Sequence, residues 1–265
     1  MRSKSQTMRI DLAQDQKVFF ISDLHLGAPD HTGSQMRERT IVQWLESISP
    51  ETHTLFLVGD LFDFWFEFKQ AVPKGYTRLF GQLARMADQG IQIIIFSGNH
   101  DMWMGDYFTQ EFNALVLREP QTFTIQGKTF WIGHGDGLGP GDYPYKFLKR
   151  IFENPICRWM FHHLLHPNLS LRLGYAWARH SWQSHVKKGD MYQYKSPEYE
   201  ILYHYCQQKH RQDPHDFYIF GHRHLRLDIP IGESSRYVNL GDWIQLKTFA
   251  SFDGNNLELK SYSSD

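Results

Sequence analysis

Residues able to bind metal ions occur in five short motifs spread along the chain. In sequence order the motifs are Asp-x-His, Gly-Asp, Gly-Asn-His-Asp, Gly-His and Gly-His-x-His, and their candidate metal ligands are Asp23, His25, Asp60, Asn99, His134, His222 and His224. Taken alone, Asp23 could cap a turn, and His134 could be a buried histidine with ordinary hydrogen-bond partners. The five motifs together, each following an apolar run, instead predict a shared metal site.

Seven oxygen and nitrogen ligands suit two divalent ions better than one. The set contains no thiolate, which argues against a structural zinc site. A mixture of Asp, Asn and His favours Mn²⁺, Fe or Zn²⁺ in a catalytic role, and Asp60 could bridge two ions if each of its carboxylate oxygens faced a different one. Two ions about 3.5–4 Å apart stabilise the attacking and leaving oxygens of phosphoryl transfer and generate hydroxide near neutral pH. The motifs therefore predict phosphoryl-transfer chemistry.

The apolar runs before the motifs are typical of buried strands. Residues 93–96, which lead into Gly98-Asn99-His100-Asp101, are apolar throughout, as expected for a strand covered on both faces. If the five strands share a sheet, their ends meet at one rim, where open α/β sheets bind ligands. Because residues i and i+2 of a strand point the same way, both side chains of Asp-x-His or His-x-His can enter one site.

The rest of the pattern predicts an α/β fold. Residues 35–48 and 75–89 have helical spacing, so the first hundred residues follow the order β-α-β-α-β and favour a mostly parallel sheet. Gln126-Gly127-Lys128 predicts a hairpin turn between two strands. Residues 197–210 predict a further helix, and short strands are expected near residues 237–239, 244–249 and 257–262.

The composition of the chain restricts the kinds of partner that we expect, but it says little about the fold. With 265 residues and a net charge of −1, the chain has no global basic field, so no nucleic-acid partner is expected. Its two cysteines, Cys157 and Cys206, form no CxxC pair, and no apolar window approaches the roughly 18 residues of a membrane span. We expect a soluble cytoplasmic protein, with peripheral contact to the cytoplasmic face of the inner membrane left open.

The five motifs resemble those of the calcineurin-like metallophosphoesterase superfamily: D-x-H, G-D, G-N-H-[DE], [GH]-H and G-H-x-H. The resemblance implies a four-layer α/β/β/α sandwich of two mixed sheets, formed by a single domain over residues 1–265. It also implies two ligand sets bridged by Asp60, namely Asp23, His25 and His224 for one ion and Asn99, His134 and His222 for the other. As catalytic residues it implies His100, in contact with the phosphoryl group or the leaving oxygen, and Asp101, which would orient His100.

A narrower resemblance, to the UDP-2,3-diacylglucosamine diphosphatase family, covers most of the chain. It rests on residues 21–27, 59–65, 134–136 and 239–243, with the sequences ISDLHLG, GDLFDFW, HGD and NLGDW. It implies that water attacks the UMP-side phosphorus of a doubly acylated UDP-sugar, giving UMP and 2,3-diacylglucosamine 1-phosphate in lipid A biosynthesis. Two Mn²⁺ ions are the expected cofactors. The chain departs from the best-known branch at His100, where that branch has arginine.

The same resemblance implies a helical cap that is inserted at about residues 140–195 and receives the acyl chains. It further implies substrate contacts, which are Asn99, His100, Asp136, Ser181, Lys187 and Lys188. Residues 137–190 contain eight Lys/Arg against three Asp/Glu, interleaved with apolar side chains such as Phe147 and Trp159. These apolar side chains could line a lipid site or pack the insertion onto the fold. The excess positive charge favours contact with substrate or with an anionic membrane surface.

Two other functions are compatible with the motifs. Another metal-dependent phosphoesterase or phosphodiesterase, acting on a nucleotide or lipid phosphate, would use the same ligands, but a small polar substrate would not require an aromatic cap. A non-catalytic scaffold would retain the fold and lose metal ligands, and none of the seven is missing here. The acylated UDP-sugar is therefore the expected substrate.

Overall fold

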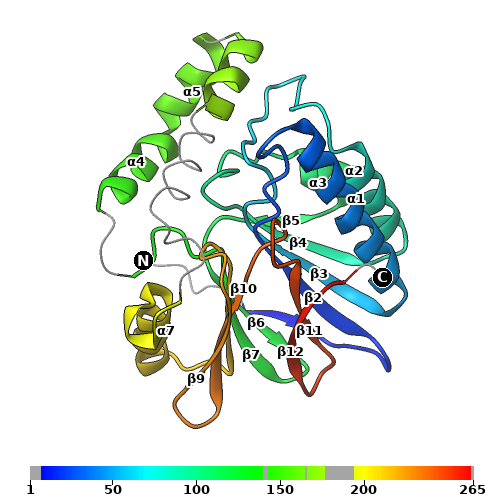
Figure 1. Ribbon diagram of the computed structural model, residues 1–265, viewed down its shortest axis with the longest axis vertical. Helices are drawn as coiled ribbons and strands as arrows, with labels where there is room; N and C mark the ends of the chain where they lie inside the picture. Colours follow the sequence, from blue (N-terminus) through cyan, green and yellow to red (C-terminus); the bar gives the residue numbers. More distant parts are fainter. Residues whose placement is uncertain (1–6, 140–142, 165, 177–193, 264–265) are drawn as a thin grey trace.

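Two six-stranded β-sheets face each other in the computed structural model, which describes residues 7–139, 143–164, 166–176 and 194–263 (Figure 1). The first has the order β12–β11–β2–β3–β4–β5, formed by Leu257–Ser261, Thr248–Phe252, Lys17–Ile21, Thr52–Val58, Gln92–Phe96 and Leu115–Leu117. The second has the order β1–β6–β7–β8–β10–β9, formed by Met8–Ile10, Gln121–Ile125, Lys128–Ile132, Phe217–Phe220, Ser235–Leu240 and Arg226–Ile231. Both contain parallel and antiparallel pairs.

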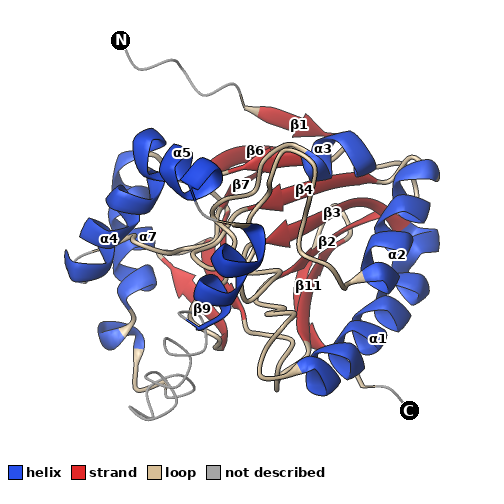
Figure 2. Cartoon of the chain, turned by 90° about the horizontal axis from the view of Figure 1, so that it is seen from above, coloured by secondary structure: helices blue, strands red, loops and turns tan. Residues whose placement is uncertain are grey.

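Helices cover the outer face of each sheet. α1 (His31–Ile48), α2 (Thr77–Asp88) and α3 (Tyr107–Phe112) pack on the first sheet, and α7 (Ile201–Gln212) packs on the second. Figure 2 shows α1 and α2 along one side of the strands. Two short 3-10 helices, η1 (Ser49–Glu51) and η2 (Pro197–Tyr199), precede β3 and α7. The predicted α/β/β/α sandwich of two mixed sheets is confirmed.

Alternate side chains of the central strands enter two different cores. In β2, Phe19 and Ile21 pack beneath the helices, while Val18 and Phe20 pack between the sheets. Phe20 stacks on Phe56 of β3, with ring centroids 4.9 Å apart. Both faces of these strands are buried, which explains why their sequences are apolar throughout.

α4 (Tyr143–Glu153) and α5 (Pro155–Leu164) lie apart from the two sheets, above them in Figure 1. Residues 167–176 are also helical. We call residues 143–176, within the predicted insertion, the cap. Trp103 joins the cap to the body, because its Nε1 donates a hydrogen bond of 2.8 Å to the carbonyl of Phe152. In the described ranges, no helix has the length and apolar character needed to cross a bilayer.

The structure corrects several predicted elements. The strands before the five motifs do not share one sheet, because β2, β3 and β4 belong to the first sheet and β7 and β8 to the second. The strand predicted at residues 244–249 begins only at Thr248, because the Asp242 carboxylate accepts hydrogen bonds from the amides of residues 244–246 and holds a turn. The sequence pattern does not predict β1, β5, β9 or α3.

Candidate metal centre

The candidate ligands lie in loops just beyond the strand ends. β2 ends at Ile21 and β8 at Phe220, so the motifs that follow lie outside the hydrogen-bonded ladders. Five candidate ligands have left-handed backbones with φ between 43° and 68°, namely Asp23, His25, Asp60, His222 and His224. This conformation is uncommon for residues other than glycine and often marks functional loops. The side chains therefore converge through sharply turned loops and not through strand alternation, which is the mechanism that the sequence suggested.

Glycine is required where these loops pass one another. A Cβ atom at Gly98 would overlap the carboxylate of Asp60, and one at Gly221 would overlap the hydroxyl of Ser22. In both places the loop backbone lies against a polar group that belongs to, or supports, a candidate ligand. The glycines beside the motifs therefore let loops from both sheets approach a common point.

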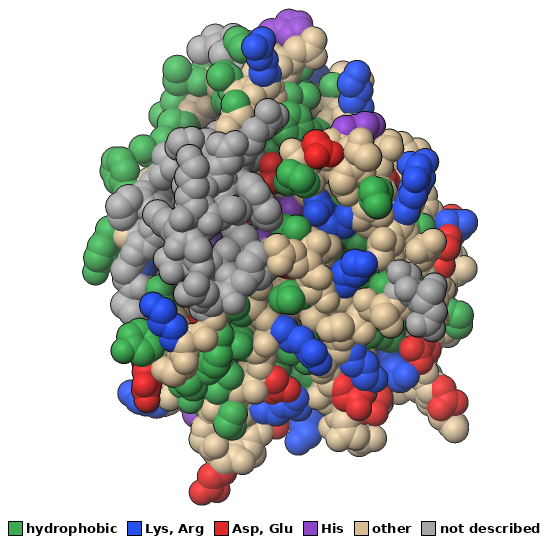
Figure 3. Space-filling view, viewed as in Figure 1, with side chains coloured by type: hydrophobic (Ala, Val, Ile, Leu, Met, Phe, Trp, Pro, Cys, Tyr) green, Lys and Arg blue, Asp and Glu red, His purple; other side chains and the backbone are tan. Residues whose placement is uncertain are grey.

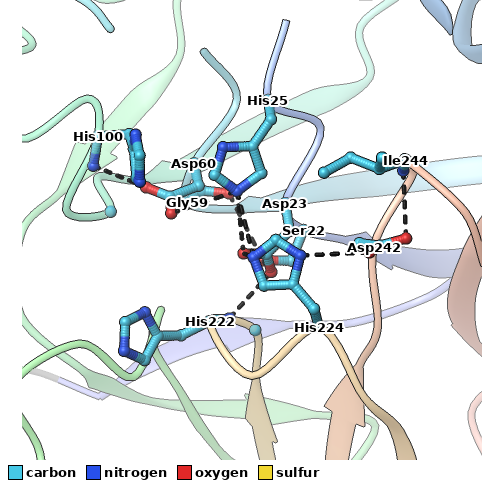
Figure 4. A network of polar contacts seen from close by, with 12 residues as sticks. Ser22, Asp23, His25, Gly59, Asp60, His100, His222, His224, Asp242 and Ile244 are labelled. Carbon is cyan, nitrogen blue, oxygen red and sulfur yellow. Dashed lines mark hydrogen bonds and ion pairs between the residues drawn. The ribbon is translucent and has the colours of Figure 1, made fainter. Parts of the chain in front are cut away.

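Asp23, His25 and His224 form one group of potential metal ligands (Figure 4). Nε2 of His224 lies 3.3 Å from Oδ1 of Asp23 and 3.3 Å from Nε2 of His25. The other oxygen of Asp23, Oδ2, accepts hydrogen bonds from the Ser22 hydroxyl at 2.6 Å and the His222 amide at 2.9 Å. Oδ1 is buried and accepts no hydrogen bond from the described part of the chain. A buried carboxylate oxygen beside two imidazole nitrogens fits a cation site.

Asp60, His134 and His222 form a second group, and Asn99 joins it. Nε2 of His134 lies 3.2 Å from Oδ2 of Asp60 and 3.3 Å from Oδ1 of Asn99. Nδ1 of His222 lies 3.0 Å from the same Asn99 oxygen. The structure thus brings all seven sequence-predicted ligands together. It also separates His222 and His224, two residues apart in sequence, into different groups.

Asp60 lies between the two groups. Its Oδ2 is 3.2 Å from Nε2 of His134 and 3.6 Å from Nε2 of His25. Its Oδ1 accepts a hydrogen bond of 2.9 Å from the His100 amide. The single oxygen Oδ2 therefore faces both groups, whereas Oδ1 faces the His100 amide. That each oxygen contacts a different ion stays a prediction.

Hydrogen bonds from the far side of two imidazole rings fix their orientation. Nδ1 of His134 lies 2.9 Å from the carbonyl of Val58, and Nδ1 of His224 lies 3.2 Å from Oδ2 of Asp242. A carbonyl or carboxylate only accepts, so each Nδ1 donates, and Nε2 is the nitrogen that would bind an ion once its proton is lost, as in metal-binding histidines. Asp242 is not among the ligands predicted from the sequence. Its position after a glycine and an apolar strand, like that of Asp60, is the pattern that could have revealed it.

Burial and charge act in opposite directions on these groups. Burial alone lowers the pKa of His134, but Asp60 raises it to about 10. Burial alone raises the pKa of Asp23, but His224 and His25 lower it to about 2. Burial, with His134 close by, lowers the pKa of His222 to about 4. The Asp23 carboxylate is therefore ionised near neutral pH, which supplies negative charge for a divalent cation.

His100 lies beside the first group and against Asp63, a residue that the sequence analysis did not select. Nδ1 of His100 is 2.9 Å from the carbonyl of Asp63. Oδ1 of Asp63 is 3.7 Å from that nitrogen and 3.6 Å from Nδ1 of His25. Asp63 thus contacts both a candidate ligand and the candidate catalytic histidine. Its sequence signal is its position three residues after Asp60, at the end of a Gly-Asp-x-x-Asp segment.

Asp101 has other partners than the predicted one. Oδ1 accepts a hydrogen bond from the Gly98 amide and Oδ2 one from the Leu61 amide, both at 2.7 Å. Burial, reinforced by the charge of Asp60, raises the pKa of Asp101 to about 7. The carboxylate therefore joins the loop after β4 to the loop after β3.

An apolar pocket of about 280 Å³ lies between the centre and the cap. Asn99 and His100 line it from the metal side. Its other walls come from the body and the cap and include Phe64, Trp103, Ile151, Cys157, Phe161 and Leu173. The pocket thus joins the polar centre directly to apolar side chains.

Asp136 lies in a second, smaller pocket of about 240 Å³ that also includes His134. Lys149 of α4 donates a hydrogen bond of 2.8 Å to Oδ2 of Asp136. Burial raises the pKa of Asp136, but His134 and Lys149 outweigh it and lower the pKa below its ordinary value. The other predicted head-group contacts, Ser181, Lys187 and Lys188, lie outside the described residues.

The apolar side chains of the cap fall into two sets. Phe152 and Phe161 pack on Trp103 of the body, with ring centroids 5.4 Å and 4.9 Å away. Phe147, Ile156 and Trp159 are 66%, 68% and 54% exposed. Figure 3 shows hydrophobic side chains along the edge of the molecule where α4 and α5 lie. Some cap residues therefore pack the insertion onto the fold, and others form an exposed apolar surface.

Comparison with known proteins establishes the family. The model of the calcineurin-like phosphoesterase family matches residues 16–226, and the chain belongs to that family. The chain is 36% identical over 255 residues to UDP-2,3-diacylglucosamine hydrolase of Porphyromonas gingivalis, covering 92% of this chain and 97% of that protein. It is 29% identical over 240 residues to the protein of the same name from Aeromonas salmonicida, covering 86% of each.

Proposed function

We propose that this phosphoesterase hydrolyses the pyrophosphate of UDP-2,3-diacylglucosamine to UMP and 2,3-diacylglucosamine 1-phosphate, a step of lipid A biosynthesis. The observation that carries the proposal is the junction of the metal centre with the apolar pocket. Asn99 contacts His134 and His222 through Oδ1 and also lines that pocket. A substrate that joins phosphate groups to acyl chains suits such a junction. The relatives named UDP-2,3-diacylglucosamine hydrolase support the same substrate.

The donor atoms of the two groups fit divalent cations. Asp60 would contact both ions, and the remaining ligands would be Asp23, His25 and His224 for one and Asn99, His134 and His222 for the other. When bound, the ions supply positive charge at the phosphoryl oxygens and make an attacking water more acidic. We propose Mn²⁺ as the ion, because it accepts mixed oxygen and imidazole ligands.

The protein's own residues position the reacting groups. Since Nδ1 of His100 donates to the Asp63 carbonyl, Nε2 is the ring nitrogen that can contact a phosphoryl or leaving oxygen. Asp63 holds this ring beside His25, and Asp101 holds the Gly98 loop that carries it. The sugar lies near Asp136 in this proposal, with Ser181, Lys187 and Lys188 as further predicted contacts.

The exposed apolar surface of the cap supports a peripheral position on a membrane. Phe147 and Trp159 are exposed on α4 and α5, and Lys146 and Arg150 lie on α4. Apolar side chains among basic ones suit the interface of an anionic bilayer. We propose that the enzyme takes its acylated substrate from the cytoplasmic face of the inner membrane.

Hydrolysis of matched substrates tests the proposal. Mn²⁺-loaded protein is incubated with UDP-2,3-diacylglucosamine and, separately, with UDP-N-acetylglucosamine, and products are followed by ³¹P NMR in H₂¹⁸O. The expected result is UMP carrying ¹⁸O from the acylated substrate and much slower turnover of the other. Equal rates would contradict the role of the apolar pocket. Absence of UMP, with hydrolysis of a simple phosphodiester retained, would assign a different phosphoesterase activity.

A further inference from the structure

A cavity of about 1000 Å³ adjoins the metal centre and is distinct from the apolar pocket. Gly27 and Asp63 line it, and Asp63 also lies 3.6 Å from Nδ1 of His25. The start of α1, the segment leading into α2 and the end of the described cap form the rest of its wall. The cavity therefore reaches the same reacting centre from another direction.

One helical segment separates this cavity from the apolar pocket. Arg172, Tyr175 and Ala176 line the cavity, whereas Leu173 and Gly174 line the pocket. Residues three and four apart share one face of a helix, so the polar and apolar sides of this segment face different spaces. Gly174 fits closely against the body, because a Cβ there would overlap the ring of Phe64.

Two cations at the cavity have no counter-ion within the ranges that the structure describes. Lys74 and Arg172 both line it and make neither an ion pair nor a side-chain hydrogen bond there. The buried acid Glu38 is already engaged, because its Oε1 accepts hydrogen bonds from the amides of Arg78 and Leu79 at the start of α2. Two further acids line the cavity, but Asp30 accepts the Gly33 amide at the start of α1 and Asp63 lies against His25 and His100. Lys74 and Arg172 are therefore the charged side chains left to meet an anionic ligand.

The neutral lining suits a heterocyclic base better than a lipid. The amide of Gln35, half-buried on α1, makes no hydrogen bond with a described residue and offers both a donor and an acceptor. The half-buried ring of Tyr175 is also in the wall, whereas Tyr76 is buried against Phe62 and its hydroxyl donates to the carbonyl of Leu26. An aromatic ring and an amide edge are groups that recognise a flat base.

We propose that this cavity binds the nucleotide half of the substrate. Lys74 and Arg172 face the phosphate and ribose, and Gln35 contacts the base. Asp63, which lines the cavity, lies 3.7 Å from Nδ1 of His100, which lines the apolar pocket. The pyrophosphate therefore lies between the base on one side and the acyl chains on the other. This inference deepens the proposed function and rests on it.

Ligand binding to three variants of the Mn²⁺-loaded protein tests the inference. The variants are the double substitution Lys74→Gln with Arg172→Gln, the single substitution Gln35→Leu, and the control Lys69→Gln, an exposed lysine outside the cavity wall. Calorimetry measures binding of UMP, ribose 5-phosphate, inorganic phosphate and 2,3-diacylglucosamine 1-phosphate. Metal content is measured for each protein.

The double variant should bind UMP about tenfold more weakly, the loss expected for one charge-assisted contact. Its affinity for ribose 5-phosphate should fall together with that for UMP. Its affinity for inorganic phosphate and for the lipid phosphate, which would bind at the metal centre, should change less than twofold. Gln35→Leu should weaken the binding of UMP and leave the affinity for ribose 5-phosphate unchanged. Lys69→Gln should bind all four ligands as the parent protein does.

Unchanged UMP affinity in the double variant would overturn the inference, as would an equal loss for all four ligands. A loss confined to the lipid phosphate would assign the cavity to the lipid head group and also overturn it. The proposed function fails separately, if the parent protein does not turn over UDP-2,3-diacylglucosamine. The binding comparison does not depend on that turnover.

Discussion

The rim of the two sheets and the cap present opposite kinds of side chain. At the rim, acidic residues are buried, with Asp23 0% and Asp60 1% exposed. On the cap, apolar residues are exposed, with Phe147 at 66% and Ile156 at 68%. Buried charge suits a cation, and exposed apolar surface suits a lipid. The difference supports the proposal that the rim performs the chemistry and that the cap selects the substrate.

The largest effect is expected at the rim. Asn99→Ala removes the oxygen that lies 3.3 Å from Nε2 of His134 and 3.0 Å from Nδ1 of His222. Turnover of UDP-2,3-diacylglucosamine and of bis(p-nitrophenyl) phosphate should both fall by about 10²–10³-fold or more, as when one preorganised electrostatic contact is lost. Steady-state kinetics on both substrates, with circular dichroism during heating, measure turnover and unfolding.

Asn99 is only half-buried, so the melting temperature of Asn99→Ala should stay close to that of the parent. His134→Ala is the companion variant from the other sheet. Retained turnover in a metal-loaded Asn99→Ala protein would remove Asn99 from the centre.

A smaller and more selective effect is expected where the cap meets the rim. Cys157 lines the apolar pocket, and Cys157→Phe fills part of its volume of about 280 Å³. The ratio of kcat/KM on the acylated substrate to that on bis(p-nitrophenyl) phosphate should fall about tenfold, a typical result of obstructing an apolar pocket. Cys157→Ala, which leaves the space open, is the matched control. Equal losses of kcat/KM on both substrates would show that the pocket does not select the acylated substrate.

On the outer face of the cap, the expected change is in membrane binding. Trp159→Ser and Phe147→Ser each remove an exposed apolar side chain. Partition to vesicles containing anionic lipid, measured by sedimentation, should fall about tenfold for each variant, because apolar burial in the interface is lost. Met36→Ser, which alters a side chain 63% exposed on α1, controls for apolar residues elsewhere. The same loss with Met36→Ser would place membrane contact outside the cap.

The smallest effect is expected far from both regions. Gly81 lies within α2, and a Cβ added there meets nothing within 4 Å. Gly81→Ala should raise the free energy of unfolding by about 0.5–1 kcal/mol, because alanine loses less backbone entropy than glycine in a helix. Chemical denaturation measures this gain, and kcat/KM should not change. A change in activity would show that α2 influences the rim.

Much of the rim could be predicted because its residues follow recognisable strands. The Ile93–Phe96 run identifies β4, and the motif after it contains Asn99, His100 and Asp101. Only the backbone geometry shows which oxygen or nitrogen of each side chain faces the centre. The position of Oδ2 of Asp60 between two groups depends on the left-handed turn at that residue, with a φ of 52°. Spacing in the sequence does not encode such a turn.

Other features escaped prediction for a different reason. The Asp63 carbonyl contacts Nδ1 of His100, and the Asp242 carboxylate contacts Nδ1 of His224. Each contact joins two loops that are separated in the sequence. No local pattern distinguishes a carboxylate that supports an imidazole from one that caps a turn, and Asp242 does both. The division of the central strands into two sheets is likewise set by which face each apolar side chain packs against, as in Phe19 and Phe20.

The placement of the ligands has a mechanical consequence. Asp23 and Asp60 follow strands of the first sheet, whereas His134, His222 and His224 follow strands of the second. Each ion would therefore be bound by residues that follow strands of both sheets. It would link the two sheets at one edge of the sandwich. Part of the binding free energy of the metal then resists separation of the layers. Withdrawal of the ions would loosen the fold and stop the reaction in the same event.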